Sequence, residues 1–266
     1  MAIATVDDIV AGLAAKQRLT FLKNINAPKA AGAFQSSWLA TGIPGAGSAS
    51  PAYTAGSGYT CDRTTAGAIA YNNGAVQNWL AKLFAGASQI GTLILADRLW
   101  SCSGMGFAIG TYTVTTPGSL PARITDSGVG CELWVEQFAA AGAASGTLTA
   151  NYLNTAAQAK SGVIAAVVSA PVIGQMQPVP LQTGDVGISQ LTSVANSATW
   201  TSGSWGMTIL KRIAEIELPI IGAGKTLDWA ALSLPQIPAN ACLMAFWLAN
   251  ATTAPVVIGR GEVIDK

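Results

Sequence analysis

Residues 91–100 carry the strongest hydrophobic pattern in the chain. The segment is short, apolar and rich in branched residues, with a glycine at its start and the turn-forming residues 101–104 after it. This pattern predicts a strand that is buried on both faces. We therefore expect it to be the first strand of a β-sandwich that continues to the C terminus.

Several short segments downstream also have strand patterns. Leu148, Ala150 and Tyr152 alternate mainly with Thr and Asn, which predicts a half-buried strand. Glycines separate the segments at intervals of about 8–15 residues, a spacing typical of a sandwich or barrel. The predicted strands span residues 91–100, 107–115, 130–139, 146–154, 162–168, 175–181, 187–195, 206–218, 242–249 and 256–264. Residues 206–218 also fit a helix, but flanking Gly and Pro favour a strand. Residues 229–234 predict a crossing loop.

Two segments near the N terminus have helical spacing. In residues 5–13, Thr5 can cap a helix whose apolar stripe is Val6, Ile9, Val10 and Leu13. Such a short helix is unstable alone in water. It therefore either packs on its own domain or docks on a neighbouring subunit. Residues 74–85 predict a second helix, which covers one end of the sandwich.

Residues 27–58 predict an extended arm. They are mostly Ala, Gly, Ser and Pro, with one apolar island that contains Phe34 and Trp38. A loop of this length is functional, follows a partner surface or is disordered. We expect Phe34 and Trp38 to anchor it on a surface. The chain then divides into residues 1–89, with a helix, an arm and a covering helix, and a sandwich domain at 90–266. We expect the sandwich to fold without residues 1–58.

Composition suggests a large contact surface. Of the 266 residues, only 10% are charged and 50% are hydrophobic, and the mean hydropathy is +0.41. A weakly polar surface is typical of an interface. The longest apolar runs are too short for a membrane-spanning helix, which needs about 20 residues. The N terminus lacks the basic start of a signal peptide, so none is expected.

Charge and residue types argue against several functions. The net charge of +1 gives the chain no excess of basic residues with which to bind nucleic acid. The absence of histidine removes the Ser-His-Asp and Cys-His types of catalysis. Cys61, Cys102, Cys131 and Cys242 lack the close spacing of a zinc site, so we expect buried reduced thiols. We expect no cofactor, no metal and no enzymatic activity.

Acidic residues offer little catalytic potential. On one strand, Glu132 and Glu136 would lie about 13 Å apart, too far for glycoside hydrolysis. Glu215 and Glu217, about 6.6 Å apart, are expected to face solvent near Lys211 or Arg212. Asp97 and Arg98 interrupt the apolar segment 91–100. We interpret this pair as a structural clamp at a sheet edge, because buried charges need partners.

Tryptophans suggest an alternative function. Trp200 and Trp205 flank a Ser- and Gly-rich segment, where an aromatic platform could stack on a sugar. Core packing or a subunit interface is the more common use of such side chains. A glycan- or host-surface-binding module is therefore the alternative function.

Three segments resemble structural proteins of tailed-bacteriophage virions. They are the run Leu-Gln-Thr-Gly-Asp-Val-Gly-Ile-Ser at 181–189, the run Trp-Gly-Met-Thr-Ile-Leu-Lys-Arg-Ile at 205–213, and the segment 34–47. The composition, rich in Ala, Gly and Thr and poor in charge, resembles such proteins too. The resemblance implies a jelly-roll-like body and a role as a capsid decoration or cement protein. Such proteins often form trimers.

The sequence therefore predicts a mainly β protein, a jelly-roll-like β-sandwich with an N-terminal helix and an extended arm. The expected function is a non-enzymatic structural protein of the virion that is made in the host cytoplasm. The alternative is a glycan- or host-surface-binding module on a phage head or tail. The expected partners are a major capsid protein or other virion proteins and further copies of the chain, with no nucleic acid and no membrane. The candidate interface residues are Val6, Ile9, Val10, Leu13, Phe34 and Trp38.

Overall fold

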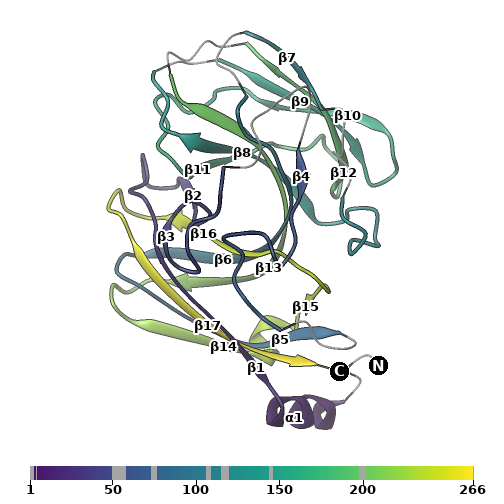
Figure 1. Cartoon of the computed structure of the whole chain (residues 1–266), viewed down its shortest axis with the longest axis vertical. Coiled ribbons are helices and arrows are strands. Elements are labelled where there is room, and N and C mark those ends of the chain that lie inside the picture. Colours follow the sequence, from purple (N-terminus) through teal and green to yellow (C-terminus); the bar gives the residue numbers. More distant parts are fainter. Residues whose placement is uncertain are drawn as a thin grey trace.

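The computed structural model describes residues 3, 5–49, 58–72, 77–105, 109–114, 120–143, 146–197 and 202–265. Within them the chain is mainly β, as predicted, with three antiparallel sheets (Figure 1). The helices are α1 (Val6–Ala14) and α2 (Trp229–Leu232). None of the helices described is long and apolar enough to span a membrane.

A closed barrel of six strands forms the middle of the molecule (Figure 1). Its order is β13-β8-β11-β2-β16-β6, and β6 closes the ring by pairing with β13. The barrel strands are β2 (Phe34–Ser36), β6 (Gly91–Ser101), β8 (Cys131–Ala139), β11 (Gln175–Pro178), β13 (Ser204–Leu218) and β16 (Leu243–Ala249). A short strand, β4 (Tyr59–Thr60), adds to β6.

Two further sheets flank the barrel. The basal sheet, drawn at the bottom of Figure 1, has the order β14-β5-β17-β1-β3, with β15 paired to β5. Its strands are β1 (Gln17–Asn24), β3 (Thr41–Ile43), β5 (Asn78–Ala87), β14 (Gly224–Asp228), β15 (Gln236–Ile237) and β17 (Val256–Asp265). The distal sheet at the top has the order β10-β9-β12-β7. Its strands are β7 (Gly110–Thr113), β9 (Leu148–Asn154), β10 (Ala159–Ile164) and β12 (Ile188–Asn196).

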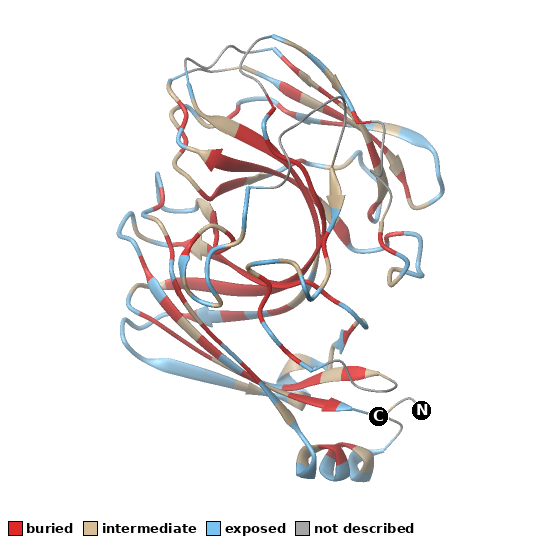
Figure 2. Ribbon diagram, in the orientation of Figure 1, coloured by how far each residue is buried: buried red, intermediate tan, exposed pale blue. Residues whose placement is uncertain are grey.

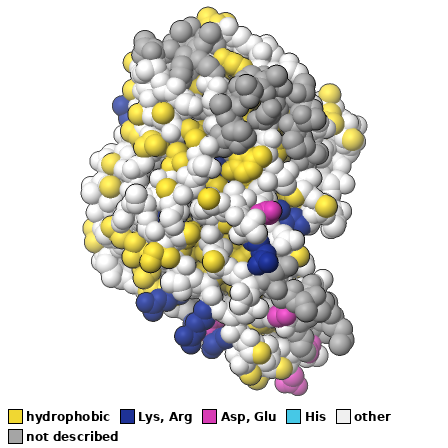
Figure 3. Space-filling model, viewed as in Figure 1, with side chains coloured by type: hydrophobic (Ala, Val, Ile, Leu, Met, Phe, Trp, Pro, Cys, Tyr) yellow, Lys and Arg dark blue, Asp and Glu magenta, His cyan; other side chains and the backbone are white. Residues whose placement is uncertain are grey.

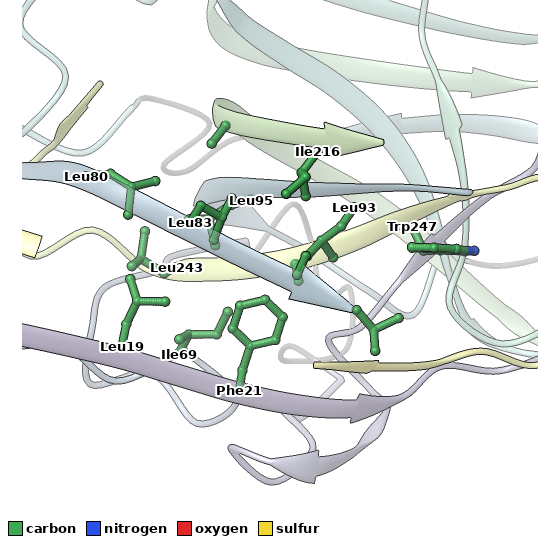
Figure 4. Close-up of a cluster of buried hydrophobic side chains, with 14 of the residues drawn as sticks. Leu19, Phe21, Ile69, Leu80, Leu83, Leu93, Leu95, Ile216, Leu243 and Trp247 are labelled. Carbon is green, nitrogen blue, oxygen red and sulfur yellow. The ribbon is translucent and has the colours of Figure 1, made fainter. Parts of the chain in front are cut away.

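Three hydrophobic cores hold these layers together. One lies between the barrel and the basal sheet, where Leu19, Phe21 and Leu83 face Leu93 and Leu95 (Figure 4). A second lies between the barrel and the distal sheet, and a third fills the barrel interior. The barrel strands are therefore buried on both faces (Figure 2), and every residue of β6 is buried, as the pattern of residues 91–100 predicts.

The predicted helix at residues 74–85 is wrong, because the described part of this segment is strand β5. Its Leu83 and Ala85 point into the core, as strand alternation requires. A β-bulge explains the misleading pattern. Val263 and Glu262 of β17 are consecutive, but they pair with Leu80 and Lys82, so Ala81 is an extra residue. The extra residue shifts the alternation and brings the apolar positions to helical spacing.

Strand β1 was not predicted, and it joins the first 58 residues to the fold. It pairs with β17 over eight residues, and its Leu19 and Phe21 are fully buried. The basal sheet thus combines strands from both sides of residue 90. Removal of residues 1–58 would expose the hydrophobic core beneath β1 to water, so the remaining chain is not expected to fold. The loop predicted at 229–234 also contains the short helix α2.

Candidate functional site

The apolar stripe of α1 is divided between the protein's own body and the surface. Thr5 caps the helix in a capping box with Asp8, as its sequence indicates. Ile9 is buried and packs with Ala81 and Ile264 of the basal sheet, with Leu13 half-buried beside it. Val6 and Val10 are 58% and 61% exposed. The helix therefore docks on its own domain and presents a second apolar face outward.

The docking of α1 is close. A Cβ atom at Gly12 would lie 3.0 Å from the Cβ of Ile264, so glycine lets the helix approach β17. A cleft of about 360 Å³ separates α1 from α2 and is lined by apolar residues that include Ile9, Trp229 and Leu234. The apolar area around Val6 continues into this cleft.

Phe34 and Trp38 pack in the protein's own barrel core. Phe34 lies in β2, half-buried, with its ring 4.8 Å from that of Trp134. Trp38 is only 1% exposed, and its indole N–H donates to the carbonyl of Ser48. The prediction that both anchor an arm on an outside surface is therefore corrected. Phe34 faces inward from the barrel strand β2, and Trp38, just after that strand, packs in the same core.

The predicted sugar platform has no exposed ring among the described residues. Trp205 is 0% exposed and contacts Tyr112 edge-on, with 5.9 Å between ring centroids. It belongs to the core between the barrel and the distal sheet. Trp200 lies outside the described residues. Burial of Trp205 leaves no surface on its ring for a sugar.

The barrel interior contains a fully buried ion pair. Arg98 of β6 and Glu136 of β8 both have 0% exposed side chains, and their closest N and O atoms are 2.7 Å apart. Thr208 donates to the same carboxylate oxygen of Glu136, and Arg98 also donates to Ser101. The guanidinium lies 4.5 Å from the Trp38 ring centroid. Burial opposes the charge of Arg98, but Glu136 raises its pKa above the usual value.

Asp97 and Arg98 point to opposite faces of β6 and do not pair with each other. Asp97 accepts two hydrogen bonds of 2.8 Å from Arg123 and a third from the backbone of Cys242. Burial raises the pKa of the Asp97 carboxyl, and Arg123 opposes that rise. The predicted clamp at a sheet edge is corrected, because β6 lies between β13 and β16. The partners Glu136 and Arg123 carry no local sequence signal, since long-range folding brings them together.

The exposed acids have neighbouring cations or donors. Glu132 accepts from the Trp134 indole and pairs with Arg212. Arg212 also binds Glu215, which matches the expectation for that strand end. Arg212 thus contacts the carboxylates of both Glu132 and Glu215. The described residues include no group of three metal-ligating side chains.

All four cysteines are free and buried, as predicted. Burial raises the pKa of Cys102 and of Cys131 to about 12. Both thiols are therefore protonated at neutral pH and are poor nucleophiles. They act as small apolar side chains of the cores.

The outer face of the basal sheet carries unpaired cations. Its strand register places residues in two rows across β14, β5, β17 and β1. The first row is Thr226, Phe84, Arg260 and Thr20, and the second is Asp228, Lys82, Glu262 and Arg18. All residues of the two rows except Asp228 line a groove of about 380 Å³. Within the described residues, no salt bridge is formed by Arg18, Lys82 or Arg260.

The acids of this face already have partners. Glu262 pairs with Lys16 at 3.3 Å, and Asp228 accepts the backbone N–H of Ala231 as the cap of α2. The groove therefore has excess positive charge around the half-exposed ring of Phe84. In the view of Figure 3, several cationic side chains gather at the lower left, and acidic side chains lie near the bottom, where Figure 1 places α1.

Exposed apolar side chains gather at the other end of the basal sheet. Ile43 is 66% exposed and lies opposite Leu22, which in turn lies opposite Ile258. The β13–β14 turn adds Ile220 and Ile221, more than 60% exposed. We call the groove and this apolar end together the basal face. It offers a partner both cationic and apolar contacts.

Comparison with known proteins gives no family. No family model matches the chain, and no curated protein matches it. AlgX of Pseudomonas aeruginosa has a TM-score of 0.24 at 9% identity, over 49% of this chain and 26% of AlgX. The chain thus spans about a quarter of AlgX. VP2 of infectious bursal disease virus, in a subviral particle, has a TM-score of 0.23 at 9% identity, over 94% of this chain and 81% of VP2. Similarity at these scores does not establish a common fold.

Proposed function

We propose that the chain is a non-enzymatic structural protein of a virion, a decoration protein that stabilises a phage shell. The observation that supports this most is the basal face, where cations without a salt bridge in the described chain lie on one sheet with exposed isoleucines on it and on an adjoining turn. Such a surface suits broad contact with another protein better than it suits a small substrate. The resemblance of three segments to virion proteins supports the same role.

The interior suits a rigid shell component. Two hydrophobic cores join the barrel to the two flanking sheets, and two buried ion pairs involve the barrel strand β6. Repetition of many weak contacts around a symmetric shell would add them by avidity. The proposed partners are a major capsid protein and further copies of the chain. The copies would form a trimer. The proposed fold of the body is jelly-roll-like. The proposed location is the virion.

The direct test is to look for the protein in purified particles. Virions of the phage that encodes the chain are purified by density gradient, and peptides of this chain are quantified by mass spectrometry against the major capsid protein. We expect a fixed ratio that corresponds to many copies per particle. Absence from intact particles, with abundant protein left in the lysate, would contradict the proposal.

A second experiment tests which surface attaches the chain to the particle. Particles are produced with the chain carrying Arg260→Glu, and with Lys29→Glu as a control for the change in charge. Lys29 is exposed and lies outside the basal groove. We expect fewer copies per particle for Arg260→Glu and an unchanged number for Lys29→Glu. Equal occupancy of both variants would show that attachment does not use the basal groove.

A further inference from the structure

The outward face of α1 is chemically complementary to the basal groove. Val6 and Val10 lie one helical turn apart and are exposed, with the exposed carboxylate of Asp7 beside them. The groove offers the ring of Phe84 for apolar contact and Arg260 for the charge. Within the described residues, neither Asp7 nor Arg260 forms a salt bridge. The outward face of α1 thus presents apolar side chains and a carboxylate, and the groove presents an aromatic ring and a cation that match them.

We propose that the basal groove of one copy receives the outward face of α1 from a second copy. The helix already makes this kind of contact within its own chain, where Ile9 and Leu13 cover Ile264. Ile264 and Glu262 are two positions apart on β17 and so lie on the same face of the sheet. The α1 of the same chain therefore covers one end of the outer face of the basal sheet, and the groove begins directly beside that end. A second helix would extend this cover over Phe84.

The groove has a floor suited to a helix. A Cβ atom at Gly224 would lie 2.3 Å from the Phe84 ring, so the absence of a side chain there lets the ring lie over β14. Cations border the ring on β17 and β5, at Arg260 and Lys82. Apolar contact in the centre with charges around it is the usual anatomy of a protein interface. The acid near Val6 then meets a cation at the border, which favours one orientation of the helix.

Docking of α1 on a second copy gives each subunit one donor surface and one acceptor surface. Two copies related by a twofold axis could exchange helices, and three could close a ring. This contact supplies the subunit association that a symmetric decoration protein needs, so the inference rests on the proposed function for its biological role. The contact itself can be tested without any shell.

The experiment measures the mass of the full chain by light scattering over a wide concentration series. We expect the wild type to change from monomer to a defined oligomer. Val10→Lys and Arg260→Glu should each raise the dissociation constant about tenfold or more, because each brings like charges together across the contact. Lys29→Glu is the matched control and should leave the constant unchanged. Circular dichroism and thermal unfolding establish that every variant is folded.

Rescue identifies the helix as the occupant. A chain with both Asp7→Lys and Arg260→Glu has reversed charges on the two surfaces, so it should recover a substantial part of the association lost in Arg260→Glu. A wild type that is monomeric at every concentration would overturn the inference, and so would loss of association in Arg260→Glu without loss in Val10→Lys. A monomer found in virions would leave the proposed role in the shell intact and would refute the trimer. If the chain forms an oligomer but is absent from virions, the proposed function is refuted and the contact between α1 and the basal groove still stands.

Discussion

The barrel interior and the basal face use the same kind of charged residue in opposite ways. Arg98 is fully buried, pairs with Glu136 and stacks on Trp38. Arg260 is exposed, pairs with no acid in the described chain and borders a groove. A buried cation without a partner would be strongly destabilising, whereas an exposed one keeps its hydration. Only the second kind is free to bind another molecule.

This difference matters in a chain with few charges. Many of its cations are committed to internal contacts, such as Arg98, Arg123 and Lys211. Lys23 is buried too, and its ammonium group donates to the carbonyls of Ala40 and Gly45. The cations of the basal groove, which form no salt bridge within the described residues, contrast with these, and we expect substitutions in the two regions to have different consequences.

Removal of the buried acid should have the largest effect. Glu136→Ala leaves Arg98 buried without its partner, so we expect the free energy of unfolding to fall by about 3–5 kcal/mol. Urea unfolding at neutral pH measures the change. The double variant Arg98→Met with Glu136→Leu removes both charges and should recover much of the loss. A loss below about 1 kcal/mol for Glu136→Ala would show that the interior pair is not structural.

The buried lysine should give a pH-dependent effect. Burial lowers the pKa of Lys23 from 10.5 to about 8. Between these values the unfolded state binds a proton that the native state does not, so this group makes the free energy of unfolding rise with pH. Between pH 7.5 and 9.5 the rise should be about 2 kcal/mol. Below the native pKa, Lys23 is protonated in both states, and it no longer makes the free energy of unfolding depend on pH.

The measurement compares urea unfolding of the wild type and Lys23→Met at several pH values. The difference between the two chains isolates Lys23, because tyrosines and cysteines contribute equally to both. We expect the wild type to gain stability relative to the variant as pH rises. Parallel curves would mean that Lys23 titrates as a solvated lysine.

The helix cap should have a smaller, local effect. Thr5→Ala removes the side-chain acceptor for the backbone N–H of Asp8. We expect α1 to lose about 1 kcal/mol of local stability. Faster amide hydrogen exchange in residues 6–14, with unchanged exchange in β17, would report it. Unchanged exchange in α1 would show that packing on Ile264 alone orders the helix.

An exposed ion pair should have the smallest effect. Arg212 binds Glu132 and Glu215, and the side chains of all three are at least a third exposed. We expect Arg212→Ala to change the free energy of unfolding by less than about 1 kcal/mol, and added salt to reduce the difference. A loss above about 2 kcal/mol would place Arg212 with the structural charges of the interior.

Sequence patterns predicted the strands better than the partners of their side chains. Residues 91–100 and 206–218 have local periodicity, and the structure places β6 and β13 there. Helix α1 was found from its cap and apolar spacing. Strand β5 was missed because the bulge at Ala81 gives helical spacing, and β1 because it lies in a segment read as part of an extension.

The site was harder to predict, for a physical reason. The apolar residues of α1 were identified, but burial of Ile9 and exposure of Val10 depend on the tertiary position of β17. The basal groove joins residues 18, 82 and 260, which come together only through long-range strand pairing. No local motif marks such a surface. The aromatic anchors were misplaced for the same reason, since Trp38 belongs to a barrel that closes across the whole chain.

Lysine reactivity tests the contrast between the two regions most directly. The protein is acetylated under mild conditions at low and at high concentration, and mass spectrometry follows each lysine. We predict that Lys23 is slow at both concentrations, that exposed Lys29 is fast at both, and that Lys82 changes from fast to slow as the chain associates. Equal reactivity of Lys82 at both concentrations, in a sample whose mass has risen, would contradict the assignment of the basal face as the contact surface.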